Sequence, residues 1–313
     1  MARTGIVSIG ECMLELSGRG NHSGGGEDWR LGFAGDTLNT LWALRALVDP
    51  ERTTNYISAF GDDPFSRDQI AFFKANGIGI GDSPVIPGAR PGLYAITLTG
   101  AERSFTYWRN DSAARQLASD PAKLAKSLEN QALVYFSGIT LAILEPAARK
   151  VLFAAVDAAR TAGSLVAFDA NYRPRLWRSV DEAREATAEA LSLTDMALPT
   201  FPDEQSLHGD ATPEATAQRL AAAGVKEVAV KNGELPATLC CEGKVETVAA
   251  VHVEVPVDTT GAGDSFNGSY LAARLAGLPP LEATRRAHAV AAAVVQVRGA
   301  LAPFETLRAA FAG

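Results

Sequence analysis

The chain has 313 residues, of which 47% are hydrophobic and 21% are charged, and its formal net charge is −7. This length allows one large domain or two smaller ones with a substantial buried core. The acidic balance and the lack of a basic cluster argue against a nucleic-acid-binding protein, and no run of about 18 apolar residues predicts a membrane span.

The N-terminal sequence and the cysteines indicate a cytoplasmic protein. "MARTGIVSIGE" has one arginine and a short apolar run, but it lacks the apolar core and the cleavage site of a signal peptide. Cys12, Cys240 and Cys241 make a poor disulfide framework. We interpret them as reduced residues that pack in a cytosolic chain.

The first part of the chain alternates strand-like runs with helical patterns. Residues 5–10 (GIVSIG) predict a buried strand, and Asp36 is a candidate cap for the helix that follows it. Residues 55–60 predict another strand. Asp63 and Pro64 then offer an N-cap and a first-turn proline for the next helix.

The same alternation continues toward the C-terminus. Strands are predicted at 133–138, 164–171 and 227–231, and helices at 146–162, after the capping box Ser179-Val-Asp-Glu182, after Thr212, and from Gly263 onward. Repeated strand–helix alternation predicts an α/β fold with a mainly parallel sheet covered by helices on both faces.

Two regions, 11–35 and 85–112, break this rhythm with alternating patterns and turn glycines. Gly100 lies between two runs of strand type, so residues 92–110 predict a β-hairpin. We expect the two regions to form a small separate sheet that closes, as a lid, over the crevice at the carboxyl ends of the strands. The glycine-rich run 18–26 is interpreted as a surface turn.

The stretch "DTTGAGDSFNG" (258–268) places a carboxylate directly after a Gly-Ala-Gly turn and at the start of a helical pattern. Its small residues let successive backbone N–H groups converge at a helix N-terminus, where anions are favoured. Asp264 would normally repel a phosphate there, so we interpret it as the acceptor of a proton from an attacking hydroxyl. The alternative is that Asp264 is only a favourable acid in the first turn of a helix.

Two longer segments carry a family resemblance. "DTTGAGDSFNGSYLAARLAG" (258–277) resembles the C-terminal signature of the ribokinase-like (PfkB) carbohydrate kinases, and "GFAGDTLNTLWALRAL" (32–47) resembles their N-terminal signature. Shorter segments, among them "GECMLELS", "FTYWRN" and "NYRPRLW", are similar to the 2-keto-3-deoxygluconate kinase subgroup. The resemblance implies one kinase domain over 1–313, with a three-layer α/β/α core, a β-sheet lid, and ATP and Mg²⁺ as cosubstrates.

The resemblance also implies roles for individual residues. Asp264 would be the general base for phosphoryl transfer to the C6 hydroxyl of the sugar acid, beside an anion hole formed by the backbone of Gly261, Ala262, Gly263 and Asp264. The sugar would be held by Gly35, Asp36, Asn39, Tyr94, Tyr107, Arg109 and Arg173. The nucleotide would contact Asn171, Lys231 and Gly233, and Arg173 is an alternative contact for the ATP phosphates.

Two metal positions follow from the resemblance alone. The family's N-x-x-E magnesium motif is imperfect here, where the segment reads "PTFPDEQSL", and Glu204 with its neighbour Asp203 is the candidate for the metal-water shell. Both acids could instead be ordinary residues of a helix's first turn after Pro202. Asp258 falls in a region that in relatives helps to hold a monovalent cation such as K⁺.

The case for an acidic sugar depends on Arg109 and Arg173, which each lie beside an aromatic residue in a sparsely basic chain. Arginine matches a carboxylate with two donors, although each arginine could instead form a local salt bridge, and Tyr94 and Tyr107 could simply pack. A kinase of a neutral sugar, such as ribose or fructose, and a non-catalytic sugar-binding regulator are the competing functions. The resemblance also implies a homodimer or a higher homo-oligomer joined through the lid, since lid sheets in relatives often pair between subunits and an exposed apolar sheet face is costly.

Overall fold

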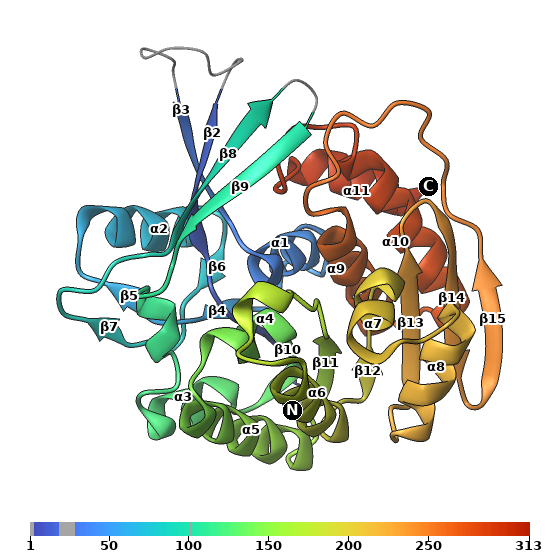
Figure 1. Ribbon diagram of the computed structural model, residues 1–313, viewed down its shortest axis with the longest axis horizontal. Helices are drawn as coiled ribbons and strands as arrows, with labels where there is room; N and C mark the ends of the chain where they lie inside the picture. Colours follow the sequence, from blue (N-terminus) through green and yellow to red (C-terminus); the bar gives the residue numbers. More distant parts are fainter. Residues whose placement is uncertain (1–2, 19–28, 100–101) are drawn as a thin grey trace.

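The central feature of the computed structural model, which describes residues 3–18, 29–99 and 102–313, is a long sheet (Figure 1). Among these residues the sheet has nine strands, in the order β15-β14-β13-β12-β11-β10-β1-β4-β6. Their bounds are β1 Gly5–Ile9, β4 Thr54–Ile57, β6 Ile78–Gly79, β10 Gln131–Ser137, β11 Leu165–Asp169, β12 Met196–Ala197, β13 Glu227–Asn232, β14 Leu235–Cys241 and β15 Lys244–Val248. Neighbouring strands pair in parallel except where β14 meets β13 and β15, so the predicted mainly parallel sheet is confirmed.

Helices cover both faces of this sheet, as the alternation predicted. Their bounds are α1 Asp36–Leu47, α2 Pro64–Ala75, α3 Pro121–Leu128, α4 Gly138–Ile143, α5 Pro146–Thr161, α6 Val180–Ser192, α7 Phe201–His208, α8 Pro213–Ala222, α9 Ala262–Leu275, α10 Pro280–Val294 and α11 Phe304–Ala312, with short 3₁₀ turns at Ala113–Gln116 and Pro174–Leu176. The α/β/α layering expected from the resemblance is therefore confirmed.

Alternate residues of each strand enter two separate hydrophobic cores, because successive side chains of a strand point to opposite faces. On β1, Ile6 joins the core that also contains Leu41 of α1 and Tyr270 of α9. Its neighbour Val7 joins the other core, which contains Leu152 of α5 and residues of α3, α6 and α8. Strands buried on both faces read as continuous apolar runs, which is why these segments were recognisable in the sequence.

The two regions that break the alternation come together in a second sheet, which projects from one end of the molecule (Figure 1). Its four strands have the order β3-β2-β8-β9, with the bounds β2 Met13–Gly18, β3 Trp29–Ala34, β8 Leu93–Thr99 and β9 Glu102–Trp108. Parallel pairing of β2 with β8 joins the first region to the second. We call this the small sheet. The predicted turn at Gly100, and residues 19–28 of the glycine-rich run, lie outside the described residues.

Part of the second region belongs elsewhere. Val85–Ile86 (β7) pairs with Phe60–Gly61 (β5) in a separate two-stranded sheet, so the second region contributes to the small sheet only from Leu93 onward. The predicted strand at 55–60 is correspondingly wrong in its extent, because β4 ends at Ile57 and β5 begins at Phe60.

Helix caps were predicted with mixed success. Asp63 accepts a hydrogen bond from a backbone N–H group at the start of α2, as expected, and Thr212 does the same at the start of α8, the helix predicted to follow it. Asp36 is not a cap, because α1 begins at Asp36 itself and Gly35 occupies the cap position. The capping box at Ser179 is only half formed, since the Glu182 carboxylate accepts its bond from the Arg178 backbone.

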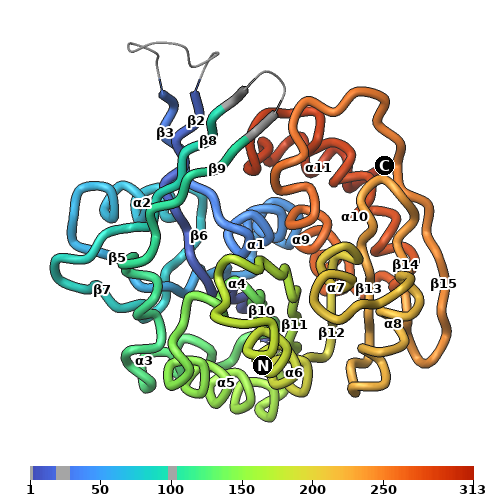
Figure 2. Tube along the Cα trace, viewed as in Figure 1, coloured from blue at the N-terminus to red at the C-terminus, as the bar shows by residue number. Residues whose placement is uncertain are grey.

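The parallel strands bring several polar residues to one edge of the central sheet. In Figure 2, β10, β11, β12 and β13 follow one another across the molecule in the order they have in the sheet, and β1 pairs with β10 on one side and with β4 on the other. Asp169 ends β11, and Lys231 lies near the end of β13, so both reach the carboxyl edge. Within the described residues, none of the helices combines the length and the apolar character needed to cross a membrane.

Candidate active site

The first turn of α9 begins at a glycine that no other residue could replace without strain. Gly261 adopts the left-handed conformation, with φ of 75°, at the N-cap of the helix. A Cβ atom there would lie 2.8 Å from the Cβ of Ala300. The first helical bond of α9 runs from the Ser265 N–H to the Gly261 carbonyl. The N–H groups of Gly263 and Asp264 precede that bond and are free to face an anion, whereas the Ala262 N–H bonds to the Thr259 carbonyl at 3.3 Å. The anion hole expected at this turn stays a prediction.

Asp264 is half-buried and is held by a residue of another helix. The Asn39 side-chain amide donates a 2.8 Å hydrogen bond to Asp264 Oδ2, and α1 and α9 lie side by side (Figure 1). Burial raises the pKa of Asp264 to about 7, and the charge of Asp36 adds to this effect. The Asn39 hydrogen bond and the Lys231 charge act in the opposite direction. A carboxylate with a pKa near neutrality is suited to accept a proton from a hydroxyl.

Asp36 is tied to a strained residue at the end of β11. The Asn171 side-chain amide donates a 2.9 Å hydrogen bond to Asp36 Oδ2, and the Asn171 backbone N–H bonds to Asp169 Oδ1 at 3.0 Å. Asn171 has φ of 35°, in a region that residues other than glycine rarely adopt. Strain of this kind is concentrated at functional sites, and Asn171 was predicted to contact the nucleotide.

Lys231, which the sequence places at the nucleotide, is buried and donates two hydrogen bonds within the protein. Its Nζ lies 2.6 Å from Asp169 Oδ2 and 2.7 Å from Asn267 Oδ1. The Asn267 amide in turn donates to Asp169 Oδ2 at 2.8 Å and to the Tyr135 hydroxyl at 3.2 Å. Gly233, the other predicted nucleotide contact on this strand, lies in the exposed turn after β13 with φ of 62°.

The inner face of the small sheet carries the two predicted tyrosines over this edge. Tyr94 and Tyr107 are paired across β8 and β9, and their ring centroids lie 5.7 Å apart. The Tyr94 hydroxyl donates to the Glu15 carboxylate, while the Tyr107 ring is exposed. Tyr94 also packs in one cluster with Ala300, the residue that lies against Gly261. The small sheet thus lies next to the first turn of α9.

Arg109 forms a buried ion pair that the sequence did not predict. Its guanidinium donates to the Glu11 carboxylate, and only 8% of the arginine side chain and none of the glutamate side chain are exposed. Glu11 Oε1 and Arg109 Nε have no hydrogen-bond partner among the described residues. The Arg109 guanidinium also lies 6.0 Å from the centre of the Tyr107 ring. The predicted carboxylate-binding group is therefore already neutralised, with part of its donor capacity unused.

Gly35 allows the start of α1 to lie close to the backbone of Glu11. A Cβ at Gly35 would lie 2.2 Å from the Glu11 carbonyl oxygen, and its backbone N–H is 3.4 Å from Asn39 Oδ1. The predicted sugar-binding residues Gly35, Asp36 and Asn39 thus form one short segment between Glu11 and Asp264.

Arg173 is exposed and is paired with Asp203. Its Nη1 lies 3.0 and 3.1 Å from the two Asp203 carboxylate oxygens. Burial raises the pKa of Asp203, and the Arg173 charge opposes that rise. Nothing in this pairing decides between a sugar carboxylate and the ATP phosphates as the ligand of Arg173, so both predictions stay open.

The predicted magnesium residue does not fit its role. Glu204 is buried in the first turn of α7, and its Oε2 accepts a 2.6 Å hydrogen bond from Arg219. Burial raises its pKa to about 7 despite that cation. A metal-water shell needs an accessible ionised carboxylate, so the position of Glu204 is better explained by its pairing with Arg219. Within the described ranges, no group of three or more potential metal ligands occurs.

Asp258 has a structural role in the loop before α9. Its two oxygens accept hydrogen bonds from the backbone N–H groups of Thr260 and Gly299, each at 2.9 Å. These bonds tie the turn at Gly261 to the segment that contains Ala300. The proposed monovalent cation at Asp258 stays a prediction.

Sequence reasoning missed Glu11, Asp169 and Asn267. A signal was present for the first two, because each follows or ends a buried apolar strand and so must reach the carboxyl edge of the sheet. Asn267 lies one helical turn after Asp264, on the same side of α9. No comparable signal in the sequence predicts its partners, which come from β10, β11 and β13.

Comparison with known proteins gives concordant matches. A family model described as pfkB family carbohydrate kinase matches residues 3–307. A 2-dehydro-3-deoxygluconokinase of Dickeya dadantii is 39% identical over 99% of this chain and 100% of its own. A protein of the same name from Escherichia coli is 40% identical over 97% and 99%.

Solved structures agree on the fold. A PfkB protein from Polaromonas sp. JS666 superposes with a TM-score of 0.83 at 27% identity, covering 98% of this chain and 99% of its own. An uncharacterised sugar kinase from Pyrococcus horikoshii in complex with ATP has a TM-score of 0.76 at 25% identity, over 95% and 94%. A 2-dehydro-3-deoxygluconokinase from Thermotoga maritima has a TM-score of 0.84 at 20% identity, over 99% and 100%, which shows the fold alone.

Proposed function

The chain belongs to the pfkB family of carbohydrate kinases, and we propose that it phosphorylates the C6 hydroxyl of 2-keto-3-deoxygluconate with ATP, using Asp264 as general base. It is a carbohydrate kinase of the 2-dehydro-3-deoxygluconokinase type, as its near full-length relatives at 37–40% identity are named. The acceptor hydroxyl at C6, the roles of the individual residues and ATP as the phosphoryl donor are our own inferences.

The surroundings of Asp264 support its assignment as the general base. Asp264 stands beside the free amides of the first turn of α9, is oriented by Asn39, and has a pKa raised to about 7. In the proposed step the C6 oxygen attacks the γ-phosphorus, the bond from phosphorus to the β,γ-bridging oxygen breaks, and ADP leaves. Asp264 accepts the hydroxyl proton, and the amides of Gly263 and Asp264 face the charge on the transferred group.

ATP is the donor that the site supports. The free backbone N–H groups of Gly263 and Asp264 at the start of α9, which we call the phosphate cradle, suit a phosphate group. A sugar kinase of the same fold is known in complex with ATP. Mg²⁺ usually keeps several waters and binds through substrate phosphates. Because Asp203 and Glu204 are engaged by Arg173 and Arg219, we assign no step to a metal held by them.

An acidic substrate requires a positive group at the sugar end of the site. Arg173 is exposed and can donate to a carboxylate as it stands, whereas the unpartnered Nε of Arg109 is buried and reaches a substrate only if the side chain or its neighbours move. Both are nevertheless paired with acids, and this neutrality favours a kinase of a neutral sugar as the second candidate.

A substrate panel separates these candidates. ADP release would be measured with ATP and 2-keto-3-deoxygluconate, its 6-deoxy analogue, ribose and fructose. We expect kcat/KM to be highest for the sugar acid and the 6-deoxy analogue to be inert. Turnover of the 6-deoxy analogue would exclude C6 as the acceptor, and a preference for fructose would favour the neutral-sugar kinase.

We further propose that the small sheet joins two copies of the chain. Leu31 and Trp108 are aligned in register with Leu16 and Leu93 on one face of the sheet. Leu31 and Trp108 are 43% and 56% exposed, and a second small sheet could cover them. The free cysteines agree with a cytoplasmic location.

A further inference from the structure

A pair of opposite charges is buried beneath the first turn of α9. Lys231 and Asp169 lie 2.6 Å apart, and only 7% and 3% of their side chains are exposed. Isolated charges are costly to bury, so such a pair persists only where its geometry and its hydrogen bonds compensate. Neither residue has enough exposed surface to form a binding face of its own, and the proposed phosphoryl transfer leaves both unused.

Asn267 connects this pair to the helix that carries the base. Its amide oxygen accepts from Lys231 at 2.7 Å, and its amide nitrogen donates to Asp169 at 2.8 Å. The same nitrogen reaches the Tyr135 hydroxyl at 3.2 Å. Asn267 is completely buried and follows Asp264 by one helical turn. The first turn of α9 is thereby fixed to β10, β11 and β13 together.

The buried ammonium group also lies directly behind the phosphate cradle. Lys231 Nζ is 3.9 Å from the place that a Cβ on Gly263 would occupy, and Gly263 is the residue before Asp264. The structure therefore places one cation and one anion of the core next to the proposed base without exposing either to substrate.

We propose that Lys231, Asp169 and Asn267 are positioning residues for Asp264, in which Asn267 fixes the turn and the two opposite charges balance each other beside the carboxylate. This inference depends on the proposed role of Asp264. It assigns Lys231 to the base and its helix rather than to the nucleotide.

The charged and titratable groups that face Asp264 come from four elements. Asp36 approaches from α1, Asp169 from β11, Lys231 from β13, and the Tyr135 phenol from β10. Burial raises the pKa of the Tyr135 phenol well above its usual value, so that group stays neutral. Of the core pair, Asp169 raises the pKa of Asp264 and Lys231 lowers it. The ion pair of Arg173 with Asp203 lies farther out, near Asp169.

Two isosteric substitutions test this balance because they change the charge with opposite sign. Asp169→Asn removes a negative charge, so the acid limb of kcat/KM against pH should move to lower pH. Asn267→Asp adds a negative charge at nearly the same place, so the limb should move to higher pH. We expect each shift to be about two pH units, the effect of a unit charge roughly 6–7 Å away at an effective dielectric constant of ~20.

The double variant Asp169→Asn/Asn267→Asp restores the net charge with the carboxylate on the other residue. Its acid limb should return close to that of the wild type. If the acid limbs of the two single variants shifted in the same direction, or did not shift although the variants remained folded, the cluster would have a purely structural role. If Asn267→Asp fails to fold, Lys231→Met makes the same prediction of a shift to higher pH.

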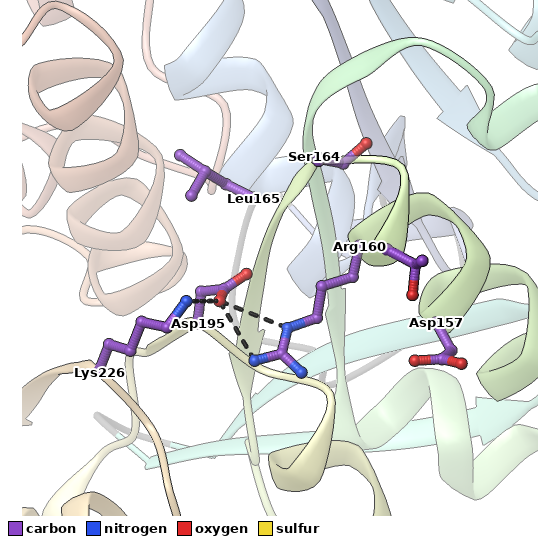
Figure 3. A pocket seen from close by; sticks show the side chains of 8 residues that line it. Asp157, Arg160, Ser164, Leu165, Asp195 and Lys226 are labelled. Carbon is purple, nitrogen blue, oxygen red and sulfur yellow. Dashed lines mark hydrogen bonds and ion pairs between the residues drawn. The ribbon is translucent and has the colours of Figure 1, made fainter.

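A matched control lies at the opposite edge of the central sheet. Asp195, immediately before β12, accepts from Arg160 of α5 and from Lys226, which precedes β13, at 3.4 and 2.9 Å (Figure 3). These residues line a surface hollow of about 390 Å³ at the amino edge of the sheet, away from α9. Asp195→Asn removes a buried ion-paired carboxylate there, and the acid limb should not move.

Asp264→Asn separates the role of Asp264 as the base from the positioning role of the cluster. If Asp264→Asn turned over as fast as the wild type, Asp264 would not be the base, whatever the cluster does. If Asp264→Asn is inactive but Asp169→Asn leaves the acid limb in place, only the positioning role is lost.

Discussion

The Asn39 side chain donates a 2.8 Å hydrogen bond to Asp264, although 225 positions separate the two residues in the chain. This bond joins the N-terminal signature segment on α1 to the C-terminal one on α9. It also orients the carboxylate and leaves its second oxygen for another partner. The proposed active site therefore exists only when the two ends of the chain have packed together.

Asp264→Asn tests the base directly. The asparagine keeps the shape and can still accept from Asn39, but it cannot accept a proton. We expect kcat to fall by about 10²–10⁴-fold, with a much smaller change in KM, in an ADP-release assay. Asp181→Asn, at an exposed acid in the first turn of α6, should stay within about twofold of the wild type. A variant of Asp264 with wild-type kcat would contradict the mechanism.

Asp264 should also make the stability of the protein depend on pH. Its pKa is raised to about 7 in the folded state, against about 3.9 in an unfolded chain. Between these values the folded state binds more protons, so the free energy of unfolding falls as pH rises. Asp264→Asn removes this decrease in the free energy of unfolding, because asparagine does not titrate. We expect the Tm of the variant, relative to the wild type, to be higher at pH 8 than at pH 5.

Glu182 provides the control with the opposite sign. Hydrogen bonds from Arg178 and the nearby Arg149 charge lower its pKa to about 2. Its contribution to stability is present above the unfolded pKa and is lost only as pH falls through about 2. Glu182→Gln should therefore lower Tm by a similar amount at pH 5 and pH 8. If the difference in Tm between Asp264→Asn and the wild type did not change with pH, the pKa of Asp264 would not be raised in the folded state.

Local features of the sequence predicted much of the fold. Strands buried on both faces, such as β10 and β11, stand out as apolar runs, and the caps Asp63 and Thr212 act on their own helices. The lengths of β4 and β5 were missed because their division depends on pairing with β7. Asp36 was mistaken for a cap because its actual partner, Asn171, lies 135 positions away.

The candidate site was predictable in its residue types but less so in its pairings. The Gly-Ala-Gly-Asp turn shows its chemistry within a few residues, since it needs small residues and an acid together. Arg109 and Lys231 carry no such local mark, because their partners are distant in the chain: Glu11 lies between β1 and β2, and Asp169 ends β11. Ion pairs of this kind are set by sheet order, which the sequence pattern alone does not specify.

Gly261→Ala tests the phosphate cradle. A left-handed conformation costs a non-glycine residue roughly 1–2 kcal/mol, and the new Cβ would also collide with Ala300. The turn must move, and a displacement of its amides should lower kcat by about 10²-fold. Gly277→Ala, after α9, has φ of 82° and nothing within 4 Å of its Cβ position. It should cost stability alone, and equal loss of kcat in both variants would argue against the cradle.

Arg109→Leu tests whether the substrate's carboxylate binds at the small sheet, but the single variant leaves Glu11 buried without its partner. Removing one member of a buried pair costs about 3–5 kcal/mol, which would obscure any effect on binding. Arg109→Leu/Glu11→Leu removes both charges, so stability measured by denaturant unfolding should largely return. If Arg109 binds the acid, KM for 2-keto-3-deoxygluconate should stay raised about 10–100-fold in the double variant, as expected for a lost charged hydrogen bond. KM for ATP should change little. A stable double variant with the wild-type KM for the sugar acid would instead limit Arg109 to holding the small sheet against β1, and would leave Arg173 as the remaining candidate.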